Sequence, residues 1–201
     1  HFDYNMNQVF FEELGIRKPD VFLDINQGSQ VNVIAAIMEA FEKFVLEYKP
    51  DLVMVPGDVN SSFACGFVAQ RLGFPVAHIE SGLRSFDMSM PEEVNRILID
   101  AIAELYFVTE ESGRQNLVKE SKDETRIKFV GNTMIDSLVA FMPIIEKSSV
   151  RQKLNISNYY LLTFHRPVNV DDADNLGKLV EIIAELADKK QVVFPIHPRT
   201  K

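Results

Sequence analysis

The sequence has 201 residues, 46% of them hydrophobic and 25% charged, with a formal net charge of −8. This composition is typical of a globular protein with one full hydrophobic core and part of a second. The negative charge, without a basic stripe, argues against a nucleic-acid-binding protein. The longest apolar runs are far shorter than the ~20 residues of a membrane-spanning helix. The first residues lack the pattern of a signal peptide, and the single Cys65 excludes a disulfide framework. We therefore expect a cytoplasmic protein.

Apolar segments of strand length alternate with segments of helical periodicity along the first three quarters of the chain. The expected strands are residues 21–25, 51–55, 75–79, 105–108 and 127–130. The expected helices are residues 4–14, 29–49, 60–72, 91–103, 110–119 and 133–147. Because a helix connects each strand to the next, the strands are expected to form a parallel sheet.

The alternation is interrupted by a polar segment, residues 148–153, and then begins again. A strand at 159–164, a helix at 172–187 and a strand at 192–196 follow. We expect an α/β protein with two Rossmann-like domains with parallel sheets, at residues 1–147 and 148–201. The second domain has too few strands for a closed α/β layer, and the first begins with a helix, so the chain is expected to be a fragment.

Two carboxylates follow neighbouring strands of the first expected sheet. Asp58 comes after strand 51–55, and Glu80 ends strand 75–79. Ligands of parallel sheets bind at the carboxyl ends of the strands, and two carboxylates there suit general acid–base chemistry. A helix cap is the alternative role for Asp58. His78, inside its strand, fits a core histidine better than a ligand.

Further polar side chains lie at other helix starts and strand ends. Glu92 and Glu93 occupy the first turn of an expected helix, where the spacing alone favours a structural role with the helix dipole. Two basic pairs follow the strands of the second domain and are able to donate hydrogen bonds to a diphosphate, although a solvated turn explains them equally well. These pairs are His165 with Arg166, and His197 with Arg199.

Other kinds of site find no support in the sequence. The four histidines are dispersed without metal-ligand spacing, so no metal is expected. A serine nucleophile is unsupported because no Gly-x-Ser-x-Gly elbow occurs. No cofactor is predicted.

Five motifs in this order resemble those of the non-hydrolysing UDP-N-acetylglucosamine 2-epimerases, over essentially the whole chain. They are Pro56-Gly57-Asp58, His78-Ile79-Glu80-Ser81-Gly82-Leu83-Arg84-Ser85, Pro91-Glu92-Glu93-Val94-Asn95-Arg96, Val130-Gly131-Asn132-Thr133 and His165-Arg166-Pro167. The resemblance implies a B-type glycosyltransferase fold, a UDP-sugar in the interdomain cleft, a homodimer and a role in supplying surface polysaccharide synthesis.

The resemblance also implies a reaction, in which UDP is eliminated to give a 2-acetamidoglucal and is then added back after protonation on the other face. Carried over by motif, Asp58, Glu80 and Glu92 handle protons. His165 is also expected to be catalytic and, with Arg166, to face the diphosphate. Arg84, His197 and Arg199 are expected to bind substrate.

One departure from the family pattern bears on the substrate. Many members continue from the His-Arg pair with an Arg-Glu-Asn type sequence, whereas this chain has Pro167-Val168-Asn169. A different substituent on the sugar is therefore a second possibility. A hydrolysing epimerase, a B-type glycosyltransferase and a non-catalytic UDP-sugar sensor are the alternative functions. The turn Ser81-Gly82-Leu83-Arg84 favours the non-hydrolysing group.

Overall fold

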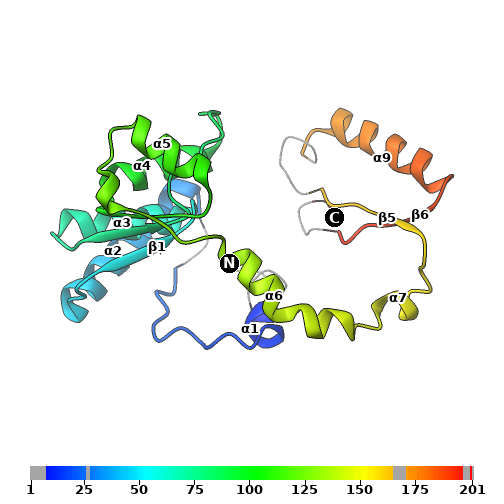
Figure 1. Ribbon diagram of the computed structural model, residues 1–201, viewed down its shortest axis with the longest axis horizontal. Coiled ribbons are helices and arrows are strands. Elements are labelled where there is room, and N and C mark those ends of the chain that lie inside the picture. The colour runs from blue at the N-terminus through cyan, green and yellow to red at the C-terminus, as the bar shows by residue number, and fades with distance from the viewer. Residues whose placement is uncertain (1–7, 26–27, 165–170, 197–199, 201) are drawn as a thin grey trace. The chain divides into compact units, whose positions relative to one another are not determined.

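The computed structural model describes residues 8–25, 28–164, 171–196 and 200. The chain divides into two compact units, His1–Ser137 and Leu138–Lys201, both visible in Figure 1. The dividing point lies within one helix, α6 (Thr133–Glu146). The domain boundary expected at residue 147 stays a prediction.

The first unit contains a four-stranded sheet in the order β1-β2-β3-β4, with all three strand pairs parallel. The strands are β1 (Val53–Pro56), β2 (Val76–Ile79), β3 (Leu105–Val108) and β4 (Ile127–Phe129). The helices are α1 (Gln8–Glu13), α2 (Gln30–Tyr48), α3 (Asn60–Arg71), α4 (Pro91–Ile102) and α5 (Glu111–Lys119), with a short 3₁₀ turn, η2 (Glu124–Arg126), before β4.

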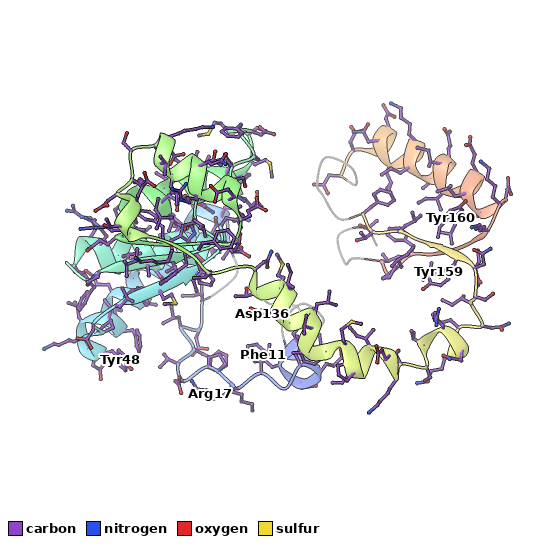
Figure 2. The ribbon with its side chains drawn as sticks, in the orientation of Figure 1. Phe11, Arg17, Tyr48, Asp136, Tyr159 and Tyr160 are labelled. Carbon is purple, nitrogen blue, oxygen red and sulfur yellow. The ribbon has the colours of Figure 1, made fainter. Side chains whose placement is uncertain are left out.

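Helix α2 shows how local sequence sets the ends of an element. The Ser29 hydroxyl caps its N-terminus by accepting a hydrogen bond from the Asn32 N–H at 3.2 Å. The helix stops where Lys49 takes a left-handed conformation (φ 51°) and donates its N–H to the Val45 carbonyl. These are the start and stop signals predicted from the sequence. Tyr48, labelled at the end of the helix in Figure 2, stacks on Phe44 with ring centroids 5.3 Å apart.

The hydrophobic core lies between the sheet and its helices. Val45, Ile99, Val108 and Leu117, from α2, α4, β3 and α5, are each 0% exposed. In β1, Val53 and Val55 are buried while Met54 between them is 50% exposed. Since successive side chains of a strand point to opposite faces, the helices cover one face of β1 and leave the other open.

One predicted strand is wrong. Residues 21–25 form no strand, and Val21 and Phe22 are 49% and 62% exposed. A strand exists only where its N–H and C=O groups find a neighbouring strand, and within residues 8–25 and 28–137 the sheet ends at β1. The other four strands of this unit occur within two residues of their predicted bounds.

The second unit has a short helix, α7 (Val150–Lys153), and then β5 (Tyr159–Leu161), α9 (Ala173–Ala187) and β6 (Gln191–Val193). β5 and β6 pair in parallel, and Tyr159 and Tyr160 extend to opposite sides of β5 (Figure 2). Asp172 caps α9 by accepting the Asn175 N–H at 2.8 Å. Among the described residues of this unit, Ile156 alone is buried.

The predicted α/β class with parallel sheets in two parts is therefore confirmed. No helix within the described ranges has the length and apolar character needed to cross a membrane.

Candidate active site

The turn after β1 places Asp58 at the carboxyl end of the sheet. Gly57 has a φ of 63°, a conformation that favours glycine, and turns the chain between β1 and α3. The residue at the N-cap of α3 is Val59, and no side chain caps that helix. Asp58 therefore does not serve as the helix cap that was the alternative interpretation of its position.

The Asp58 carboxylate is instead oriented by helix α4. The Arg96 guanidinium makes an ion pair with Asp58 and, at 2.5 Å, a second one with Glu93. The Asn95 amide donates to the Asp58 carbonyl oxygen at 2.9 Å. The Asp58 side chain is 28% exposed whereas that of Arg96 is 14% exposed, so the carboxylate stays partly open to a ligand.

Glu80 lies at the same edge of the sheet, directly after β2. Its φ of 67° is left-handed, which is uncommon and strained for a residue with a side chain and is often found at functional sites. Its Oε2 atom lies 3.4 Å from the point where a Cβ on Gly57 would stand. The structure thus brings the Glu80 carboxylate beside the residue that precedes Asp58.

Of the two glutamates at the start of α4, Glu92 is exposed and Glu93 is 1% exposed. Glu93 accepts the N–H groups of Ser85 and Phe86 at 2.9 and 3.0 Å. Burial acts to raise the pKa of Glu93, but these hydrogen bonds and the charge of Arg96 outweigh it and hold the pKa below its ordinary value. Glu93 therefore anchors the loop after β2 to α4, and the proton-handling role expected of Glu92 stays a prediction.

The loop anchored by Glu93 presents apolar side chains to solvent. Phe86 and Met88 are 79% and 63% exposed. Asp87 accepts hydrogen bonds from the Ser89 hydroxyl at 2.6 Å and from the Ser89 N–H at 3.0 Å, which close a tight turn. These two hydrogen bonds lower the pKa of Asp87.

Arg84 is placed in a buried ion-pair cluster. Its side chain is 2% exposed, and it contacts Asp100 at 2.7 Å and Glu120 at 2.7 Å. Burial acts to lower the pKa of Arg84, while the hydrogen bonds and charges of Glu120 and Asp100 raise it. The expected contact between Arg84 and the substrate stays a prediction. In such a contact, the Arg84 guanidinium would bind the substrate while it also pairs with Asp100 and Glu120.

The basic pairs expected in the second unit, His165 with Arg166 and His197 with Arg199, lie outside the described residues. The residues next to them are described. The Thr200 hydroxyl donates to the Phe164 carbonyl at 2.7 Å, so the segments that follow β5 and β6 meet at one edge of their sheet.

The sequence favoured a structural role for Glu93 without identifying its partners, and it assigned no role to Arg96. The spacing of Glu93 and Arg96, three residues apart on a helix, was an available signal for their pairing. The pairing of Arg96 with Asp58 joins residues far apart in sequence and has no such signal. No group of three or more potential metal ligands occurs among the residues that the structure describes.

These features define a class of protein: a parallel α/β fold with carboxylates gathered where the first two strands end. The family described as UDP-N-acetylglucosamine 2-epimerase matches residues 1–201. The chain belongs to this family.

Individual relatives agree with this assignment. The UDP-N-acetylglucosamine 2-epimerase of Methanococcus maripaludis is 41% identical over 100% of this chain and 57% of its own length. The UDP-2,3-diacetamido-2,3-dideoxy-D-glucuronate 2-epimerase of Pseudomonas aeruginosa is 40% identical with the same coverage, 100% and 57%. The crystal structure of the Methanocaldococcus jannaschii UDP-GlcNAc 2-epimerase in complex with UDP-GlcNAc and UDP has a TM-score of 0.90 at 40% identity, over 100% of this chain and 57% of that one. The chain thus spans a little over half the length of these proteins.

The agreement with solved 2-epimerase structures also confirms the predicted fold class, two Rossmann-like parts of the B-type glycosyltransferase kind.

Proposed function

We propose that the full-length protein is an isomerase that interconverts UDP-N-acetylglucosamine and UDP-N-acetylmannosamine by inverting carbon 2, without net hydrolysis. Family membership over the whole chain supports the reaction class. The observation that carries the proposal within the structure is the position of Asp58 and Glu80 just after two paired strands, at the carboxyl edge of one sheet, where parallel α/β proteins bind ligands.

The chemistry requires a carboxylate that takes the hydrogen of carbon 2 while the bond between carbon 1 and the diphosphate oxygen breaks. The electron pair of the C–H bond then forms the C1–C2 double bond, which gives a 2-acetamidoglucal and UDP. Return of a proton to the opposite face of carbon 2 and addition of the UDP oxygen to carbon 1 restore all atoms. Two carboxylates suit a reaction that needs proton transfer on both faces.

The residues divide between these tasks by the family motifs that they occupy. Asp58, Glu80 and Glu92 are the proposed proton-handling groups, together with His165. Arg166, His197, Arg199 and Arg84 are the proposed ligands of the substrate. Arg96 has no proposed contact with the sugar, and its ion pairs with Asp58 and Glu93 help to hold the Asp58 carboxylate.

A second substrate is favoured by one observation. The Pseudomonas relative that acts as a UDP-2,3-diacetamido-2,3-dideoxy-D-glucuronate 2-epimerase is 40% identical to this chain, close to the 41% of the archaeal UDP-N-acetylglucosamine enzyme. The same inversion at carbon 2 applies to both sugars, so the carboxylates do not distinguish them.

Incubation of the full-length protein in heavy water with each sugar nucleotide tests the proposal. Deuterium at carbon 2 of the sugar, with the epimeric UDP-sugar as product, is the expected result. Free N-acetylmannosamine with UDP identifies a hydrolysing epimerase. The absence of deuterium at carbon 2 leaves a UDP-sugar sensor or a glycosyltransferase, and transfer to an added acceptor separates these two.

The role of Asp58 is tested by Asp58→Asn in the full-length protein. Turnover is expected to fall by ~10²- to 10⁴-fold while UDP still binds, because the amide cannot take a proton. Asp51→Asn is the matched control, since Asp51 is exposed just before the other end of the same strand. Turnover of the Asp58 variant within about threefold of the parent, far below that contribution, removes Asp58 from proton transfer.

A cytoplasmic location, a homodimer and a role in supplying surface polysaccharide synthesis complete the proposal. They are supported by the family resemblance, and the oligomeric state is open to measurement by light scattering on the full-length protein.

A further inference from the structure

His78 connects the two strands that carry the candidate carboxylates. It lies in β2 and is 0% exposed. Its Nε2 atom is 2.9 Å from the carbonyl oxygen of Gly57, in the turn after β1. Its Nδ1 atom is 2.6 Å from Asp100 Oδ1, on helix α4. The ring therefore links the β1 turn to the helix that covers the sheet.

The partners of His78 decide where its hydrogens lie. A carbonyl oxygen only accepts, so Nε2 carries a hydrogen and donates it to Gly57. The other oxygen of Asp100 accepts the Gly82 N–H at 3.0 Å and contacts Arg84 at 2.7 Å. An oxygen that accepts hydrogen bonds therefore lies beside each nitrogen of the His78 ring.

The contact at Gly57 bears directly on Asp58. The Gly57 carbonyl and the Asp58 N–H belong to one planar peptide unit, so a donor that fixes the carbonyl also fixes the direction of the Asp58 backbone. On its other side, the Gly57 N–H donates to the Ile79 carbonyl at 2.9 Å. Both peptide units around Gly57 are thus held by β2. Glycine permits many conformations, so these bonds restrict the turn, in addition to the contacts that Asn95 and Arg96 make with Asp58 itself.

We propose that His78 is a positioning residue for Asp58: by donating from Nε2 to the Gly57 carbonyl, it fixes where the Asp58 carboxylate stands at the carboxyl edge of the sheet. This inference rests on the proposed function, because positioning has a catalytic consequence only if Asp58 handles a proton. A positioning role differs from a general role in the core. In a positioning role, the Nε2 bond to Gly57 matters for turnover and the Nδ1 bond to Asp100 does not.

Two amide substitutions separate the two hydrogen bonds in the full-length protein. The glutamine amide in His78→Gln reaches the place of Nε2 and keeps the donor to Gly57. The shorter asparagine amide in His78→Asn reaches the place of Nδ1 and keeps the donor to Asp100. Each variant loses one buried hydrogen bond, so similar losses of stability are expected from the two.

The expected result is a split in kcat between the two variants. His78→Gln keeps kcat within about threefold, and His78→Asn lowers it by ~10²-fold, the cost of a misplaced catalytic group, with little change in KM for either. Equal kcat values in the two variants, high or low, overturn the proposal, because a merely structural histidine does not distinguish its two nitrogens.

Asp100→Asn provides a further arm that does not depend on either His78 variant folding. Its amide is able to donate to Nδ1 of a neutral ring, which leaves the Nε2 donor to Gly57 in place. Because Asp100 also pairs with Arg84, the readout is amide exchange without sugar: we expect the Asp58 and Val59 amides to exchange as slowly as in the parent, whereas faster exchange contradicts the assignment.

Amide hydrogen exchange keeps this inference separate from the proposed function. In the absence of any sugar, the Asp58 and Val59 amides are expected to exchange faster in His78→Asn than in His78→Gln. A parent protein without epimerase activity removes the proposed function but leaves this difference to be measured. Equal exchange in the two variants overturns the positioning contact itself.

Discussion

The two units of the chain use similar local signals and reach different degrees of burial. In the first, α4 packs on a four-stranded sheet and buries Ile99 completely. In the second, α9 has an N-cap at Asp172 and an amphipathic sequence, yet none of its residues is buried. Its sheet has two strands. A helix forms from local sequence, but it buries its apolar face only against a sheet wide enough to receive it.

The largest expected difference between the units is in hydrogen exchange of the 201-residue chain. Amides of β2 and β3 are expected to exchange only through unfolding of the whole first unit, and those of α9 through local opening, at least ~10²-fold faster. Mass spectrometry of peptides after timed exchange measures this. Comparable protection of the α9 and β2 amides contradicts the expected difference and indicates a second unit as stable as the first.

The next largest effect is expected from the same substitution in one helix of each unit. Ile99→Ala removes a fully buried side chain and is expected to lower the free energy of unfolding by about 2–5 kcal/mol. Ile182→Ala in α9, at a side chain that is 53% exposed, is expected to change it by less than about 0.5 kcal/mol. Urea unfolding followed by circular dichroism compares them. A similar cost at both sites contradicts the difference in packing.

Acid is expected to destabilise the first unit through Glu93. Because its pKa in the folded state is lowered, the stability it contributes is present above the unfolded-state pKa of about 4.3 and is lost as the pH falls through the lower folded-state pKa. Glu93→Gln is expected to cost about 1–3 kcal/mol at neutral pH and to flatten this acid dependence. Glu181→Gln, at an exposed residue of α9, is the matched control. An unchanged acid dependence in Glu93→Gln excludes Glu93 as its source.

The smallest expected effect is a gain of stability at a buried polar group of the first unit. Ser81 is 0% exposed, and its hydroxyl has no hydrogen-bond partner among the described residues. Ser81→Ala is therefore expected to raise the free energy of unfolding by about 1 kcal/mol, because it removes an unsatisfied polar group. Ser157→Ala, at an exposed serine of the second unit, is expected to change little. Destabilisation by Ser81→Ala reveals a partner for the hydroxyl.

Most of the secondary structure was predictable because its signals are local. The Ser29 cap and the stop before Pro50 are examples, and so is the regular return of short apolar strands. Residues 21–25 have the same apolar pattern and form no strand, because a strand depends on a neighbour that no local pattern supplies.

The candidate site was predictable only in outline, for a related reason. Sequence order placed Asp58 and Glu80 at the same sheet edge, since parallel strands end together. It did not assign Glu93 to the loop or Arg96 to Asp58, because those contacts depend on how α4 lies across the sheet. The interpretation of His78 as a core histidine was right about burial and did not identify its two acceptors.

The close approach of Gly82 to Gly113 restricts the substitutions that these two positions tolerate. A Cβ on Gly82 would lie 2.2 Å from the Gly113 carbonyl oxygen, and the φ of 78° at Gly82 disfavours any side chain independently. A Cβ on Gly113 would in turn lie 2.9 Å from the Ser81 carbonyl oxygen. Saturation mutagenesis selected for folded protein should therefore recover glycine alone at 82 and strongly prefer it at 113.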